Sequence, residues 1–184
     1  MTLKQRQTEK IVTATLDLIT HSGLAGISMS NIAQRAGLSR QTVYNYFPDT
    51  GSILEAALAA HLDAMAAHVD AVMGKSDTLA GKLAALAGFL IDVADPAHAA
   101  LPLDAGLSAA ARARLSAREQ APRDSIARAV KAELGNEAPA LADLLWAQIE
   151  AGAATAARHP DRKPDILAAL LAATSAAIAQ GDLA

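Results

Sequence analysis

Apolar side chains recur every three or four positions through most of this sequence, and no stretch shows the strict apolar–polar alternation that a half-buried strand requires. The helical spacing is clearest over residues 50–73. Alanine strengthens the pattern, because it supplies 47 of the 184 residues, whereas aromatic residues supply 3%. Alanine loses no side-chain entropy in a helix, and strands favour β-branched and aromatic residues. The sequence therefore predicts an all-α fold.

Glycine and proline residues divide the helical pattern into segments. Gly23 and Gly37 follow the first two segments, as glycine does at helix ends, and Pro48 closes the third. The expected helices cover residues 4–22, 31–36, 40–47, 50–73, 78–94, 97–101, 108–118, 123–134, 140–158 and 164–180. We expect two domains, residues 1–48 and 49–184, with the helix over 50–73 connecting them.

Several classes of protein lack here the residues that their chemistry needs. The chain has no cysteine, which excludes disulfides, thiolate metal sites and a cysteine nucleophile. It also has no glycine-rich phosphate loop, no Gly-x-Ser-x-Gly sequence and no Glu-x-x-His pair. We therefore do not expect an enzyme, and a catalytic helical bundle is a remote alternative.

Neither a metal site nor a membrane segment is expected. His61 and His68 lie seven residues apart, about two helical turns, which is too far for one ion without further ligands. We expect no metal and no cofactor. Residues 1–10 are polar and of mixed charge, and no uncharged stretch reaches the ~20 mostly apolar residues of a membrane span. The sequence predicts a cytoplasmic protein without membrane contact.

Charge is distributed unevenly along the chain. Residues 1–48 carry five basic and two acidic side chains, a net charge of +3, whereas residues 49–184 carry 11 basic and 17 acidic side chains, a net charge of −6. A basic head on an acidic body indicates that the head binds an anion. Chance clustering on a solvated surface is the alternative for a difference of this size.

Residues 31–47 contain the residue types of a helix-turn-helix. This motif needs a small residue where its helices cross, a residue that tolerates positive φ in the turn, and an aliphatic residue on the second helix. Ala33, Gly37 and Val43 supply them at spacings of four and six residues. Although Ala-x-x-x-Gly is common in alanine-rich helical proteins, we expect the second helix to lie in the DNA major groove.

The solvent side of that second helix is rich in hydrogen-bonding side chains. Arginine, glutamine and asparagine can form bidentate contacts with base edges, whereas hydroxyl groups hold phosphates. We expect Arg40, Gln41 and Asn45 to read bases. The residues expected mainly as phosphate contacts are Ser39, Thr42, Tyr44 and Tyr46. For one of the two tyrosines, the alternative is packing against the following helix with its hydroxyl in water.

The same region resembles a known family. The motifs that carry the resemblance are Arg6, Ile11-Val12, Ala14-Thr15-Leu16-Asp17-Leu18, Gly23, Ile32-Ala33, Ala36-Gly37-Leu38-Ser39 and Thr42-Val43-Tyr44-Asn45-Tyr46-Phe47-Pro48. Together they resemble the DNA-binding domain of the TetR family of transcriptional regulators. The resemblance implies an all-α homodimer with a three-helix head, a connecting fourth helix and a helical body that binds a small effector. It also implies that the last two helices form a four-helix bundle with those of the partner chain.

One position departs from the family pattern. Family members usually carry a lysine at the start of the fourth helix, where this chain has Thr50 beside Asp49. Losing one phosphate contact lowers the logarithmic salt slope of DNA binding by ~0.9. The expected DNA-contacting residues are Lys4, Arg6, Ser28, Ser30, Arg35, Ser39, Arg40, Gln41, Thr42, Tyr44, Asn45, Tyr46 and Thr50. Lys10 belongs to the same basic arm, and ordinary solvation is the alternative for each arm residue.

The last two expected helices carry apolar and small residues on successive turns, a pattern that suits packing against another helix pair. The expected homodimer interface consists of Leu141, Leu145, Ile149, Gly152, Ala156, Leu167, Leu170, Leu171, Thr174 and Ile178. Closure of the chain's own core is the alternative.

An effector pocket is expected to be apolar with a few polar groups. The candidate ligand-binding residues are His61, Met65, His68, Phe89, Asp92, Trp146, Gln148 and Glu150. Each of them could equally be an ordinary core or surface residue.

The sequence thus predicts a homodimeric repressor that binds double-stranded operator DNA and is released by a small-molecule effector. The resemblance further implies that effector binding shifts the helix over 50–73, so that DNA and effector weaken each other's binding equally. A regulator of the same fold that acts without an effector, or as an activator, is the alternative. The operator sequence and the effector's identity have no signal in the sequence.

Overall fold

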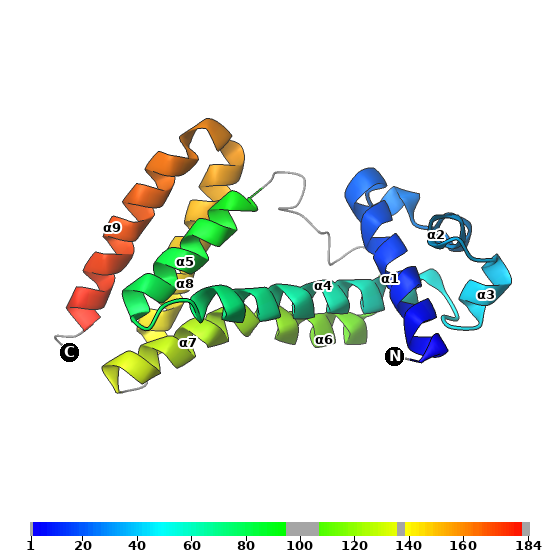
Figure 1. Cartoon of the computed structure of the whole chain (residues 1–184), viewed down its shortest axis with the longest axis horizontal. Coiled ribbons are helices and arrows are strands. Elements are labelled where there is room, and N and C mark those ends of the chain that lie inside the picture. Colours follow the sequence, from blue (N-terminus) through cyan, green and yellow to red (C-terminus); the bar gives the residue numbers. More distant parts are fainter. Residues whose placement is uncertain (1, 95–106, 136–138, 182–184) are drawn as a thin grey trace. The chain divides into compact units, whose positions relative to one another are not determined.

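The computed structural model describes residues 2–94, 107–135 and 139–181. Within these ranges all regular structure is helical (Figure 1), which confirms the all-α fold. The α-helices are α1 (Leu3–Ser22), α2 (Met29–Ala36), α3 (Arg40–Tyr44), α4 (Thr50–Met73), α5 (Leu79–Asp92), α6 (Ala109–Glu119), α7 (Ala121–Leu134), α8 (Pro139–Arg158) and α9 (Lys163–Gly181). Short 3-10 helices, η1 (Leu24–Gly26) and η2 (Pro160–Arg162), follow α1 and α8. Of the helices in these ranges, none is long and apolar enough to span a membrane. The helix expected over 97–101 lies outside the described residues.

Two expected helices are shorter in the structure, and the one predicted over 78–94 covers only Leu79–Asp92. The helix predicted over 40–47 ends at Tyr44, three residues early. Beyond it the backbone N–H of Phe47 still donates to the carbonyl of Val43 at 3.0 Å. Pro48 disfavours the helical conformation for the residue before it, so the helix has to end sooner than the apolar pattern indicates.

The described residues divide into two compact units. The first unit contains those up to Ala64 together with 107–119, and the second contains 65–94, 120–135 and 139–181. The helix α4 therefore contributes its N-terminal part to the first unit and its C-terminal part to the second. The helix α6 belongs to the first unit, although it lies far from α1–α3 in the sequence.

The first unit has two apolar clusters. One lies beneath α2 and α3, and its fully buried members include Ile11, Ile32, Val43 and Ile53. The other joins α1, α4 and the segment that contains α6. Its buried members are Ile19, Leu54, Leu58, Leu107, Ala111 and Leu115.

Ion pairs also link α4 with α6 in the first unit. Arg114 Nε donates to Glu55 Oε1 at 2.7 Å, and Arg118 Nε donates to Asp63 Oδ1 at 2.8 Å. All four side chains are at least partly exposed, so each pair contributes at most about 1 kcal/mol. Burial of the apolar cluster is therefore the main interaction that holds α6 in this unit.

The second unit surrounds a single large apolar core. Its fully buried members include Leu83 and Leu86 of α5, Ile126 of α7, and Leu145 and Ile149 of α8. The helices α8 and α9 run antiparallel on either side of η2 (Figure 1). The helix α5 packs against both α8 and α9, and α7 packs against α8 and α5.

Candidate nucleic-acid interface

Serine residues begin both helices of the α2–α3 pair. The Ser28 side chain accepts a hydrogen bond from the backbone N–H of Asn31 at 3.1 Å. Ser39 accepts one from the backbone N–H of Thr42 at 3.0 Å. Between the helices Gly37 has a φ of 66°, a left-handed conformation that glycine adopts without steric cost. These local interactions define a tight turn between two short helices.

The inner face of the pair is apolar. Ala33 is 2% exposed and Val43 is fully buried, as the helix-turn-helix interpretation requires. The backbone N–H of Leu38 donates to the Ala33 carbonyl at 2.9 Å, which closes the end of α2. Because this face is buried, the polar side chains of α3 are directed to solvent.

The expected base-reading residues lie on the outer face of α3 and at the position just after it. Arg40, Gln41, Tyr44 and Asn45 are all exposed, Tyr44 by 45%. Gln41 Nε2 donates to Asn45 Oδ1 at 3.3 Å, so the two amides lie side by side one helical turn apart. Together they present hydrogen-bond donors and acceptors of the kind that recognise adenine edges.

The two tyrosines have different environments. Tyr46 is half-buried and packs against the cluster that contains Ile53 of α4, whereas Tyr44 is exposed. Tyr46 is therefore the tyrosine that packs against the apolar cluster of the first unit, which includes one residue of α4. Thr42 is half-buried, and its hydroxyl lies 2.8 Å from that of Ser39.

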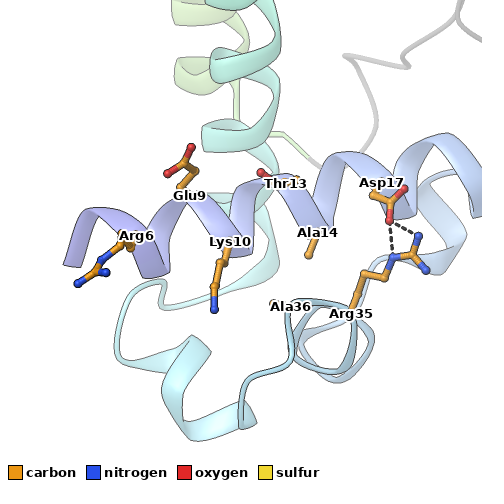
Figure 2. A pocket seen from close by; sticks show the side chains of 8 residues that line it. All are labelled: Arg6, Glu9, Lys10, Thr13, Ala14, Asp17, Arg35 and Ala36. Atoms are coloured by element: carbon orange, nitrogen blue, oxygen red, sulfur yellow. Dashed lines mark hydrogen bonds and ion pairs between the residues drawn. The ribbon is translucent and has the colours of Figure 1, made fainter. Parts of the chain in front are cut away.

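The expected phosphate-contacting cations fall into two groups. The side chains of Lys4 and Arg6 are exposed and have no hydrogen-bond or ion-pair partner among the described residues. Ser30 is also exposed. Arg35, by contrast, is paired with Asp17 of α1 through Nε and a terminal guanidinium nitrogen (Figure 2). The pairing of Arg35 joins α2 to α1. No sequence signal indicates this pair, because its members are 18 residues apart.

The position at which the resembled family usually carries a lysine holds the uncharged Thr50, and the acidic Asp49 precedes it. Asp49 Oδ1 accepts a hydrogen bond from the backbone N–H of Ser52 at 2.7 Å, as an N-cap residue does. This bond, and a smaller contribution from the Ser52 side chain, hold the pKa of the Asp49 carboxyl below its ordinary value. Thr50 is half-buried as the first residue of the helix.

The candidate effector residues are divided between the units. His61 lies in the first unit and the other seven lie in the second. The rings of His68 and Phe89 contact each other, with centroids 4.3 Å apart, and Phe89 and Trp146 pack against the large core. Gln148 is half-buried, and its Oε1 is buried without a partner among the described residues.

The remaining effector candidates are more peripheral. Met65 is half-buried, Asp92 and Glu150 are exposed, and the Asp92 carbonyl accepts a hydrogen bond from Lys163 Nζ at 3.0 Å. In the described ranges, no three ionisable side chains are grouped so as to hold a metal ion.

Many of the candidate dimer residues pack within the single chain. Those buried in the second unit's own structure are Leu145, Ile149, Ala156, Leu170 and Thr174. The half-buried ones are Leu141, Gly152, Leu167, Leu171 and Ile178. A Cβ atom on Gly152 would lie 2.7 Å from Leu170 Cδ2, so this glycine serves the close approach of α8 to α9. The apolar spacing thus largely describes contacts between these helices of one chain.

The arrangement defines an all-α protein whose N-terminal unit presents a helix-turn-helix of the DNA-binding type. The sequence profile described as "Bacterial regulatory proteins, tetR family" matches residues 11–57. This match covers 47 of the 184 residues and shows that the helix-turn-helix region is similar to that of the TetR family of transcriptional regulators.

Relatives and solved structures resemble the chain over different lengths. An uncharacterized HTH-type transcriptional regulator of Mycobacterium bovis is 38% identical over 55 residues, which is 30% of this chain and 29% of the relative. The match therefore spans less than a third of that curated relative. The TetR-family regulator SCO4454 of Streptomyces coelicolor has a TM-score of 0.74 at 15% identity, over 95% of this chain and 89% of that one. FadR of Bacillus subtilis, in complex with stearoyl-CoA, has a TM-score of 0.66 at 17% identity, over 89% of this chain and 97% of FadR. At these identities the two structures show a shared fold.

Proposed function

We propose that this protein is a homodimeric repressor that binds double-stranded operator DNA and is released by a small-molecule effector. Residues 1–48 are the proposed DNA-binding domain, and residues 49–184 the proposed effector-binding and dimerisation domain. The observation that carries the proposal is the exposed polar face of α3 on a capped, apolar-backed helix-turn-helix. We assign no catalytic activity, and a transcriptional regulator of this kind acts in the cytoplasm.

The proposed base readers are Arg40, Gln41 and Asn45. Arginine suits guanine, and the paired amides of Gln41 and Asn45 suit adenine. The proposed phosphate contacts are Lys4, Arg6, Ser28, Ser30, Ser39, Thr42, Tyr44 and Thr50. Arg35 is instead engaged by Asp17, and Tyr46 is half-buried. Because Ser28 and Ser39 already cap helices, phosphate would bind beside the same helix N-termini.

The proposed dimer uses the outer faces of α8 and α9. Each helix has an exposed stripe of mostly alanine residues at three- and four-residue spacing. These stripes are Leu144, Ala147, Ala151 and Ala154 on α8, and Ala169, Ala172, Ala176 and Ala179 on α9. Small side chains allow close helix approach, so two such pairs suit a four-helix bundle. A two-fold dimer would place its recognition helices on half-sites ~34 to 36 Å apart.

The proposed effector site lies in the helical body. The FadR structure supports the idea that this fold accommodates a small molecule, because it was solved with stearoyl-CoA. The unpartnered Gln148 oxygen in the body is a polar group that a ligand could satisfy. Because α4 contributes residues to both units, a shift of this helix would couple effector binding to DNA binding. By linkage, the DNA then weakens effector binding by the same factor.

The proposal is tested by quantitative binding to the intergenic DNA beside the protein's own gene, with footprinting to locate the protected bases. We expect tight, salt-dependent protection of a two-fold symmetric site. Gln41→Ala is expected to lower affinity for this site by about 1–3 kcal/mol while leaving binding to unrelated DNA unchanged. Tyr44→Phe is expected to weaken binding to this site and to unrelated DNA modestly, because it removes one phosphate contact.

Gln34→Ala is the matched control, since Gln34 is also an exposed glutamine of the helix-turn-helix but lies on α2. Equal, sequence-independent binding by the wild type and Gln41→Ala would contradict the assignment of α3 as the reading helix.

A further inference from the structure

Asn45 lies just beyond the last residue of α3, yet its backbone continues the helical path. Its φ of −68° and ψ of −19° are helical, and its N–H donates to the Gln41 carbonyl at 3.1 Å. Val43 before it is fully buried, and Tyr46 and Phe47 after it pack against the same apolar cluster. Buried neighbours on both sides therefore fix the backbone of Asn45, and its exposed side chain stays one helical turn beyond Gln41.

The side chains of Gln41 and Asn45 are joined by a hydrogen bond with a defined direction. Gln41 Nε2 is the donor and Asn45 Oδ1 is the acceptor, at 3.3 Å. Within the described ranges, neither side chain takes part in a further hydrogen bond. Their remaining donors and acceptors are therefore available to a base.

The hydrogen bond leaves the two amides with different capacities. A bidentate contact to adenine needs one N–H group and one oxygen from the same amide. Gln41 retains this set, because a side-chain amide has two N–H groups and only one of them is engaged. The Asn45 oxygen already accepts from Gln41, so Asn45 offers mainly N–H groups. Acceptors for an N–H group occur on guanine, adenine and thymine alike, so these donors discriminate poorly between bases.

The same bond restricts Gln41 before DNA is present. A solvated glutamine samples many rotamers, and fixing one of them on a base opposes binding. An amide pair four residues apart on a helix is a stabilising interaction, so Asn45 favours the rotamer in which Gln41 reaches toward it. Part of the ordering cost of base recognition is thereby met in the unbound protein.

We propose that Asn45 is a positioning residue, which holds the amide of Gln41 while Gln41 reads the edge of one adenine. The inference rests on the proposed DNA-binding function and narrows it. It assigns the two amides to a single adenine–thymine pair of each half-site instead of to two separate pairs. Recognition of that base pair therefore depends on both residues.

The test selects duplexes from a randomised pool with the full chain, then measures affinities for the selected duplex and for its single-pair variants. Gln41→Ala is expected to lose about a 5- to 150-fold preference at one adenine–thymine pair. Asn45→Ala is expected to lower the preference at that same pair by about 2- to 10-fold, the effect of one hydrogen bond. The double variant Gln41→Ala/Asn45→Ala is expected to match Gln41→Ala at that pair.

Asn45→Asp is the rescue variant. It keeps an oxygen that accepts from Gln41 and removes both N–H donors. We expect it to retain the preference for adenine, although its negative charge weakens binding to every duplex alike. Gln34→Ala is the matched control, because Gln34 is an exposed amide of α2, and it is expected to retain every preference. Damage to the fold would instead lower affinity for all duplexes without changing the preference at one pair.

Three results would overturn the positioning role: a change in Asn45→Ala at a different base pair from Gln41→Ala, no change in preference in Asn45→Ala, or loss of the adenine preference in Asn45→Asp. In each case Gln41→Ala would still define a sequence-specific regulator. Selection of no common sequence by the wild type would overturn the proposed function, and this inference with it.

Discussion

At the scale of single residues, the head contains both free and engaged cations. Lys4 and Arg35 are exposed, yet Arg35 has an ion-pair partner in Asp17, whereas Lys4 has none among the described residues. An unpaired cation can move to a phosphate at little cost, but a paired cation must first break its ion pair with the carboxylate.

We predict that Lys4→Gln and Arg35→Gln separate these roles. Lys4→Gln is expected to lower the salt slope of DNA binding by ~0.9 with unchanged stability. Arg35→Gln is expected to leave the slope nearly unchanged and to reduce the free energy of unfolding by less than about 1 kcal/mol, because its pair is partly exposed. Salt-dependent binding and urea unfolding of both variants provide the comparison. Equal slope losses would show that Arg35 leaves Asp17 on DNA.

A second residue-scale prediction concerns Asp49. Its folded pKa is lowered, so its contribution to stability is present above the ordinary pKa and is lost as the pH falls through the lower, folded value. Asp49→Asn keeps a side-chain oxygen for the helix cap but cannot titrate. We expect wild-type melting temperatures to fall more steeply than those of Asp49→Asn as the pH drops below about 4. Parallel pH profiles would contradict this role.

Sequence reasoning works at this scale where the interaction is local. The turn at Gly37 was expected from its residue type, and the caps at Ser28 and Ser39 involve backbone groups only three residues away. The Arg35–Asp17 pair could not be predicted, because it depends on how α2 crosses α1.

At the scale of elements, two glycines in helices of the second unit have opposite surroundings. A Cβ on Gly88 of α5 would meet nothing within 4 Å, whereas one on Gly152 of α8 would lie 2.7 Å from buried Leu170. We predict that Gly88→Ala stabilises the protein by about 0.5–1 kcal/mol through helix propensity. Gly152→Ala is expected to be about 1–3 kcal/mol less stable than Gly88→Ala, because Leu170 must move. Chemical unfolding measures both, and equal stabilities would mean that the Leu170 side chain moves aside without cost.

The helices themselves were predictable, but their partners were not. Apolar spacing shows which face of α8 is buried without showing what buries it. Leu145 and Ile149 therefore suited a dimer interface and a chain's own core equally well, and in the structure they lie in the core of the single chain. Apolar spacing also fails to show where α3 ends. Val43 and Phe47 are spaced as in a helix, but Pro48 disfavours the helical conformation for the residue before it.

At the scale of the whole molecule, the proposed dimer depends on the alanine stripes. Ala172→Arg places a long charged side chain in the middle of the α9 stripe and is expected to shift the protein to monomer. Ala132→Arg, on an exposed position of α7, is the control and is expected to remain dimeric. Sedimentation measures the assembly state, and operator affinity is expected to fall with dimer loss. A dimeric Ala172→Arg protein would place the interface elsewhere.

The membership of α6 in the first unit limits how freely the head can be moved between proteins. A fragment cut after α4 would lack Leu107, Ala111 and Leu115, and Leu54 and Leu58 would lose the side chains that cover them. Such a fragment would expose an apolar seam and be prone to self-association. A chimera meant to join this head to another sensor must therefore import residues 107–119 as well, as a graft in two pieces.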